Sequence, residues 1–210
     1  MARDLDPKCK QCRRAGEKLF LKGERCFGPK CAMTKRNYPP GVHGNKGYPR
    51  QTDYGMHLKE KQKLKRMYGI MERQLRKYFE EAAHSSEETG SKLIELLERR
   101  LDNVIYRLGL ATSRRQARQF VSHDLFKVKD KKIDVPSYRV RAGETITIRK
   151  EKSSFQGYLA ENMNKKAGKE LPSWLSWDAD KKECKIVNIP SGKDLEIGID
   201  TRLIVEFYSK

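Results

Sequence analysis

The stretch from Arg99 to Arg149 constrains the fold most strongly, because the spacing of its apolar residues changes from a helical to a strand pattern. Apolar side chains at positions 101, 104, 105 and 108 share one helical face, and Gly109 marks a stop. Thr112 or Ser113 can then cap a second helix, which we expect from Arg114 to about Asp124. The first half of the stretch therefore predicts two short helices joined by a tight turn.

The second half of the stretch alternates apolar and polar residues, as half-buried strands do. We expect strands at Phe126–Lys129 and Lys132–Val135, with Asp130–Lys131 in the turn, and a third strand at Thr145–Arg149. Pro136 ends the second of these runs. The whole stretch thus predicts a helix–helix–hairpin unit of about fifty residues.

The second predicted helix has two different faces when its residues are placed about 100° apart. One face is apolar, and the other is a cluster of guanidinium and polar groups: Arg114, Arg115, Arg118, Gln119 and Ser122. Like charges at such spacing repel one another unless an anion lies between them, and guanidinium groups match phosphate oxygens in a bidentate way. The cluster indicates a phosphate-binding surface, although an ordinary solvated helix face is the alternative.

The charge of the chain favours a polyanionic partner. The formal net charge is +18, and the excess is concentrated: residues 1–50 carry 13 Lys and Arg against 4 Asp and Glu, and residues 101–150 carry 12 against 5. No stretch approaches the roughly 18 apolar residues of a membrane span, and the first residues lack the apolar segment of a secretory signal. We therefore expect a cytoplasmic protein with two cationic contact surfaces.

Four cysteines near the start have the spacing of a metal site. They form two pairs, Cys9 with Cys12 and Cys26 with Cys31, and Gly28–Pro29 provides the turn within the second pair. Four thiolates can surround one ion in a structural site, and the segment has few apolar residues with which to form a core. Zinc is the expected metal, and an iron–sulfur cluster at the same four cysteines is the alternative.

The rest of the chain is expected to frame these two regions. Three prolines and three glycines exclude regular structure from Tyr38–Arg50, where Lys46 and Arg50 could contact RNA or form a linker. Helical spacing begins at Thr52–Asp53, where Asp53 can cap. Strands are expected at Ile186–Ile189 and Leu203–Tyr208. We expect both tryptophans, Trp174 and Trp177, to pack against apolar neighbours, and Cys184 to be buried.

Four segments resemble the RNA-binding module named after the fourth protein of the small ribosomal subunit: Arg100–Val104, Ser113–Gln119, Val121–His123 and Val135–Tyr138. The flanking sequence is similar to the bacterial form of that ribosomal protein family, from the cysteine segment through Pro40–Gly44 to Phe207–Lys210. The usual Asn-Gly at the turn of the hairpin is replaced here by Asp130–Lys131.

The resemblance implies an α+β fold with two domains. The first is mainly helical, with a metal-binding segment of four cysteines and a basic loop at 1–50 and helices at 51–98, against which residues 199–210 pack. The second, at 99–198, contains the helix–helix–hairpin module (99–150) and a small antiparallel sheet. The implied function is a structural, non-enzymatic one: binding a junction of small-subunit ribosomal RNA early in assembly. Implied too are contact with the neighbouring fifth small-subunit protein, a position on the path of messenger RNA, an influence on decoding accuracy and repression of its own messenger.

The candidate RNA contacts combine this resemblance with the charge pattern. They are Arg3, Lys8, Lys10, Arg13, Arg14, Lys22, Arg25, Lys46, Arg50, Lys59, Lys63, Arg66, Arg107, Arg114, Arg115, Arg118, Gln119, Ser122, His123 and Lys127.

Three other classes of protein compete with this interpretation. The same module occurs in shorter RNA-binding proteins, in RNA-modifying enzymes and tRNA synthetases, and a zinc protein could instead bind DNA. The sequence contains no phosphate loop, GxGxxG fingerprint or Gly-x-Ser-x-Gly elbow, and its four histidines do not cluster. A preference for structured RNA over duplex DNA at matched salt would distinguish the RNA-binding interpretation from the DNA-binding one.

Overall fold

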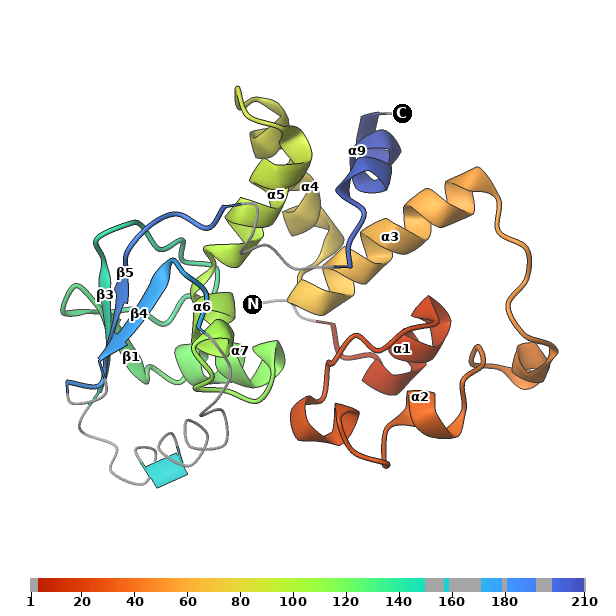
Figure 1. The fold of residues 1–210 in the computed structure, drawn as a ribbon, viewed down its shortest axis with the longest axis horizontal. Coiled ribbons are helices and arrows are strands. Elements are labelled where there is room, and N and C mark those ends of the chain that lie inside the picture. Colours follow the sequence, from red (N-terminus) through yellow and green to blue (C-terminus); the bar gives the residue numbers. More distant parts are fainter. Residues whose placement is uncertain (1–3, 150–156, 159–170, 179–180, 192–197, 210) are drawn as a thin grey trace. The chain divides into compact units, whose positions relative to one another are not determined.

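The computed structural model describes residues 4–149, 157–158, 171–178, 181–191 and 198–209. They divide into two units, one within residues 1–93 and 197–210 and the other within residues 94–196. The described part of the first unit is helical, and the second combines helices with a small antiparallel sheet (Figure 1). The expected α+β class is therefore confirmed.

Helix α3, Asp53–Tyr68, is the main helix of the first unit. It is capped by Thr52, whose hydroxyl accepts a hydrogen bond from the Gly55 amide at 3.2 Å, and not by Asp53 as expected. It ends at Gly69, whose φ of 64° is the left-handed conformation that closes a helix. Helix α4, Glu72–Ala83, follows at once, and helix α5, Thr89–Glu98, crosses the sequence boundary between the units.

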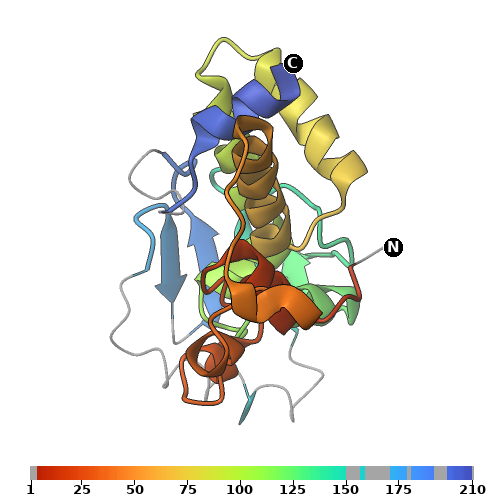
Figure 2. The same cartoon turned by 90° about the vertical axis from the view of Figure 1, so that its right-hand side faces the viewer.

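The C-terminal segment is helix α9, Thr201–Ser209, so the strand expected at Leu203–Tyr208 is wrong. Its apolar residues at 203, 204, 207 and 208 have the spacing of a helical face. In so short an apolar run, this spacing is hard to distinguish from a strand pattern. Helix α9 packs along α3, beside which it lies in both views (Figure 1 and Figure 2). Glu72 of α4 links the two helices, because its carboxylate accepts hydrogen bonds from Lys61 of α3 at 2.7 Å and from the Tyr208 hydroxyl of α9 at 2.9 Å.

The first fifty residues form short helices: α1 (Lys8–Ala15), the 3₁₀ turn η1 (Gly23–Cys26), α2 (Ala32–Lys35) and the 3₁₀ turn η2 (Val42–Lys46). The last of these corrects the expectation of no regular structure around the prolines. A small core holds the segment together, made of Cys12, Ala15, Leu19, Cys31 and Met33. Two of its five members are cysteines, so apolar packing alone contributes little here.

The second unit contains the expected helix pair and hairpin. Helix α6 spans Leu101–Arg107 and helix α7 spans Arg114–Ser122, with Gly109 at a φ of 86° between them. Strands β1 (Phe126–Val128), β2 (Lys131–Lys132), β3 (Thr145–Ile148), β4 (Leu175–Asp178) and β5 (Glu183–Ile186) form an antiparallel sheet in the order β2-β1-β3-β5-β4.

The hairpin turn lies one residue earlier than predicted. Val128 pairs with Lys131, so Lys129 and Asp130 occupy the turn, and both have positive φ, 48° and 64°. A two-residue turn between twisted strands requires this conformation, and here it forms without glycine.

A single core lies between the helix pair and the sheet of the second unit. Fully buried members include Leu101, Val104 and Ile105 of α6, Phe126 of β1 and Cys184 of β5. Trp174 is buried there and Trp177 packs against the cluster, so the expected packing roles of both tryptophans and of Cys184 are confirmed. The strand expected at Ile186–Ile189 instead ends at Ile186, and Val187 and Ile189 are exposed.

Candidate nucleic-acid interface

The sequence of helix α7 fixes both where it begins and which side it buries. Ser113 accepts a hydrogen bond from the Gln116 amide at 3.3 Å, and the Gln116 side chain accepts two from Thr112, from its amide and its hydroxyl, both at 2.8 Å. These bonds satisfy donors that a helix start leaves without partners. Ala117 and Val121 are fully buried, so the opposite face is turned outward.

A buried polar chain connects α6 to the first arginine of α7. Asn103 is 1% exposed, and its Oδ1 accepts a hydrogen bond from Nε of Arg114 at 2.7 Å. Its amide nitrogen donates to the Glu98 carboxylate at 2.7 Å and to the Glu98 carbonyl at 3.0 Å. The Arg114 guanidinium also lies over the Tyr106 ring, 4.7 Å from its centre. These contacts hold the guanidinium in one orientation.

A second buried group supports Arg118. Arg100 is fully buried and donates two hydrogen bonds to the Asp102 carboxylate, at 3.1 and 2.8 Å. The same carboxylate lies 3.9 Å from Nη1 of Arg118. A buried ion pair of this kind contributes little net stability, but its fixed geometry can position a neighbouring group. Residues of α6 thus position two arginines of α7.

Most of the predicted α7 contacts lie on its outer side. Arg115, Gln119, Ser122 and His123 are exposed, whereas Arg114 and Arg118 are half-buried and held by the contacts above. Lys127, on β1, is half-buried. Arg107 is different, because it donates to the buried Glu98 carboxylate at 2.9 and 2.7 Å, so its charge is used within the protein. The face can offer several cationic donors to phosphate oxygens.

The residues that position these arginines were not predicted as functional. Glu98, Arg100, Asp102 and Asn103 are all buried, yet the sequence marked the last three only as part of the resemblance. The available signal was local: an acidic and an amide residue stand within the otherwise apolar start of a helix. Buried polar residues require partners, and that requirement points to a network.

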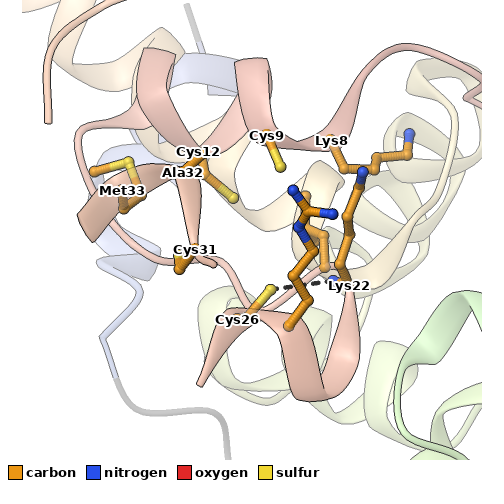
Figure 3. A pocket seen from close by; sticks show the side chains of 10 residues that line it. Lys8, Cys9, Cys12, Lys22, Cys26, Cys31, Ala32 and Met33 are labelled. Carbon is orange, nitrogen blue, oxygen red and sulfur yellow. Dashed lines mark hydrogen bonds between the residues drawn. The ribbon is translucent and has the colours of Figure 1, made fainter. Parts of the chain in front are cut away.

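The four N-terminal cysteines line one pocket, together with Lys8, Leu21, Lys22, Arg25, Ala32 and Met33. Figure 3 shows the thiols of Cys9, Cys12, Cys26 and Cys31 arranged around it, with the Lys22 amide donating to the sulfur of Cys26 at 3.3 Å. Burial, and the other three cysteines, raise the pKa of the Cys12 thiol. The donor set suits zinc, but no group of three or more His, Cys, Asp or Glu side chains in the described chain is arranged to hold a metal ion. The metal therefore stays a prediction.

The basic residues predicted to bind RNA in the cysteine segment divide by exposure. Lys10, Arg14, Lys22 and Arg25 are exposed. Lys8 is instead buried and paired with Asp4 at 2.8 Å, and Arg13 donates to the carbonyls of Tyr38 and Pro39 at 2.9 and 3.1 Å. Arg3 lies outside the described residues. Exposed cations are suited to an RNA contact, whereas those of Lys8 and Arg13 hold the segment together.

The remaining candidates follow the same division. Lys46, the last residue of η2, and Arg50 are exposed, and Lys59 is half-buried on α3. Lys63 is buried and paired with Glu17 at 2.9 Å, which makes it a structural residue. Arg66 is half-buried, and burial lowers the pKa of its guanidinium, opposed by the nearby carboxylate of Asp4. Of the three RNA contacts predicted on α3, Lys63 is therefore buried, and Lys59 and Arg66 are half-buried.

Two family comparisons cover most of the chain. Residues 3–98 match the ribosomal protein S4/S9 N-terminal domain, and residues 99–146 match the S4 domain. The chain is 49% identical to small ribosomal subunit protein uS4 of Thermus thermophilus, 50% to that of Kosmotoga olearia and 48% to that of Acetivibrio thermocellus. Each alignment covers 210 residues and the whole length of both proteins. Among the described helices, none has the length and apolar character that crossing a membrane requires.

Proposed function

Because the chain belongs to the uS4 family of small-subunit ribosomal proteins, we propose that the outer face of α7 is a principal surface with which it binds ribosomal RNA. Membership makes the protein a structural, RNA-binding component of the small ribosomal subunit and not an enzyme. The observation that supports the surface is the Asn103–Arg114 hydrogen bond at 2.7 Å, in which a buried amide orients a cation. Side chains fixed before binding lose less conformational entropy when they contact phosphate.

The exposed cations of the first fifty residues form the second proposed contact. Lys10 and Arg14 lie on α1, and Lys22 and Arg25 line the cysteine pocket. Lys46 ends η2, and Arg50 follows it in the sequence. We assign the first four to ribosomal RNA and the last two to the path along which messenger RNA enters the subunit. An early role in assembly, contact with the fifth small-subunit protein, an influence on decoding accuracy and repression of its own messenger belong to the same proposal, and each rests on the family.

A zinc ion bound by Cys9, Cys12, Cys26 and Cys31 completes the proposal. The shared pocket and the absence of a disulfide among the described cysteines support it. An ion with four thiolate ligands has no open position for catalysis, so its role would be to fold the segment and hold its cations. The thiols would have to approach one another to close on the metal.

Chemical footprinting on protein-free small-subunit ribosomal RNA tests the proposal. We expect the protein to protect a compact set of helices that meet at a junction, and an Arg114→Ala, Arg115→Ala, Arg118→Ala variant to lose part of that protection. Metal analysis of the same sample tests the cysteine site. Protection scattered over the whole RNA, or none at physiological ionic strength, would contradict the proposal.

A further inference from the structure

Two phenylalanines form a stacked pair on the surface of the cysteine segment. The rings of Phe20 and Phe27 have centres 5.0 Å apart and planes inclined by 28°. Phe20 is 40% exposed and Phe27 is 63% exposed, although phenylalanine is usually buried. Single exposed apolar residues are common, but a stacked exposed pair presents one continuous aromatic surface.

The pair is mounted on anchored neighbours. Leu19, directly before Phe20, is 2% exposed and belongs to the core of the segment. Cys26, directly before Phe27, is buried and lines the cysteine pocket. The chain therefore buries one residue of each pair of neighbours and turns the aromatic one outward.

The backbone at Phe20 is in a conformation that a bulky residue rarely adopts, with a φ of 51°. Such strain persists where the surrounding structure imposes it, and it is often found at binding sites. Here the left-handed turn follows the buried Leu19 and accompanies the placement of the Phe20 ring against Phe27. The strain thus coincides with the formation of the aromatic surface.

The surroundings of the pair are cationic. Lys18, Lys22, Arg25 and Lys30 are exposed in the same segment, and Glu24 is the one acidic residue between positions 18 and 30. An apolar protein partner would gain little from these charges, whereas a nucleic-acid strand offers bases to the rings and phosphates to the cations. Aromatic faces stack on bases of any sequence, and adjacent basic groups follow the backbone.

We propose that Phe20 and Phe27 form a stacking platform for an unpaired base of the small-subunit RNA, while the neighbouring cations contact the flanking phosphates. The proposal rests on the proposed RNA-binding function and extends it to a contact that reads single-stranded RNA. The cysteine segment would then bind unpaired bases as well as phosphates, because a base can stack on these rings only when it has left its helix.

The test compares Phe27→Leu, which keeps an apolar side chain without an aromatic face, with Phe27→Tyr, which keeps that face. Leu5→Ala is the matched control, because Leu5 is exposed in the same unit and is not part of the pair. We expect Phe27→Leu to bind the small-subunit RNA about tenfold more weakly at fixed salt. Phe27→Tyr and Leu5→Ala should stay within about twofold of the original protein. The salt dependence should be unchanged in all three, because stacking releases no counterions.

Chemical probing of the bound RNA identifies the base. Phe27→Leu should expose one or two unpaired nucleotides and leave the rest of the footprint intact. Equal affinities of all variants for RNA would overturn the proposal, as would a loss seen only when other ribosomal proteins are present, which would assign the pair to a protein partner. If the unaltered protein does not bind the RNA, the proposed function fails instead, so the two failures are distinguishable.

Discussion

Replacing Asn103 with alanine tests whether this residue positions Arg114 for RNA in addition to stabilising the fold. Asn103 makes three hydrogen bonds, to the Glu98 carboxylate, the Glu98 carbonyl and Arg114, at 2.7, 3.0 and 2.7 Å. Two of these partners are charged, and hydrogen bonds to charged groups contribute about 1.5–3 kcal/mol each. The Glu98 carboxylate keeps both hydrogen bonds from Arg107, so it is not left without a partner and the loss of stability is smaller. We expect the free energy of unfolding to fall by about 3 kcal/mol.

The same substitution should weaken RNA binding in a specific way. Without the buried acceptor, Arg114 loses its fixed orientation and pays more conformational entropy to contact a phosphate. We therefore expect this phosphate contact to be lost, which reduces the magnitude of the negative slope of log K against log salt by about 0.7–0.9. Affinity should be measured by filter binding or fluorescence over a range of salt concentrations, at a temperature where the variant is fully folded.

Val104→Ala provides the matched control. Val104 is the next residue of α6 and is fully buried in the core, so its truncation costs about 2 kcal/mol by loss of packing. We expect that variant to be less stable but to keep the original salt slope. If Asn103→Ala lowers stability and leaves the slope equal to that of Val104→Ala, then Asn103 supports the fold only and does not position Arg114 for RNA.

Three further predictions concern other parts of the chain. Burial opposes the shift at Glu72, but hydrogen bonds from Lys61, Tyr208 and Lys65 outweigh it and lower the pKa of that carboxyl below 4.5. The stability that this carboxylate contributes is therefore present above pH 4.5 and is lost as the pH falls through its lower folded-state pKa. In Glu72→Gln, the free energy of unfolding should lack this acid-dependent contribution. Identical profiles of stability against pH for the two proteins would contradict the role of Glu72. Chelation of the proposed zinc ion, or Cys12→Ser, should increase proteolysis of residues 1–50 and weaken RNA binding. Unchanged cleavage in the variant would argue against a segment held by a metal. Burial raises the pKa of the Cys184 thiol to about 12, so at about pH 8 an alkylating reagent should modify it only after unfolding; rapid modification of the native protein, located by mass spectrometry, would show that it is not buried.

Local patterns predicted the helix pair and the sheet class correctly. The apolar spacing at 101–108, the stop at Gly109 and the cap at Ser113 each act within a few residues, and the structure has α6 and α7 where they indicate. The hairpin turn was displaced by one residue, because Lys129 and Asp130 adopt positive φ without the glycine that usually signals it. Short-range chemistry thus predicts elements well and their exact ends less well.

Local sequence patterns did not predict contacts between residues that are far apart in the sequence. The run Leu203–Tyr208 is apolar enough for a strand, but it forms helix α9, whose apolar face packs on α3. In the same way, Lys63 is separated from its partner Glu17 by more than forty positions, so from local sequence it resembles a surface cation. Tertiary context decides such cases, because short apolar or charged runs fit more than one environment.

If oriented arginines on α7 bind folded ribosomal RNA, the salt dependence of binding must report their contacts with phosphate. The measurement compares the unaltered protein with an Arg114→Ala, Arg115→Ala, Arg118→Ala variant on small-subunit ribosomal RNA and on duplex DNA at matched salt. We expect steep salt dependence and a preference for the RNA. In the variant, the negative slope of log K against log salt should lose about 2 of its magnitude. Equal slopes for the two proteins, or equal affinity for RNA and DNA, would show that these arginines are not a specific contact with ribosomal RNA.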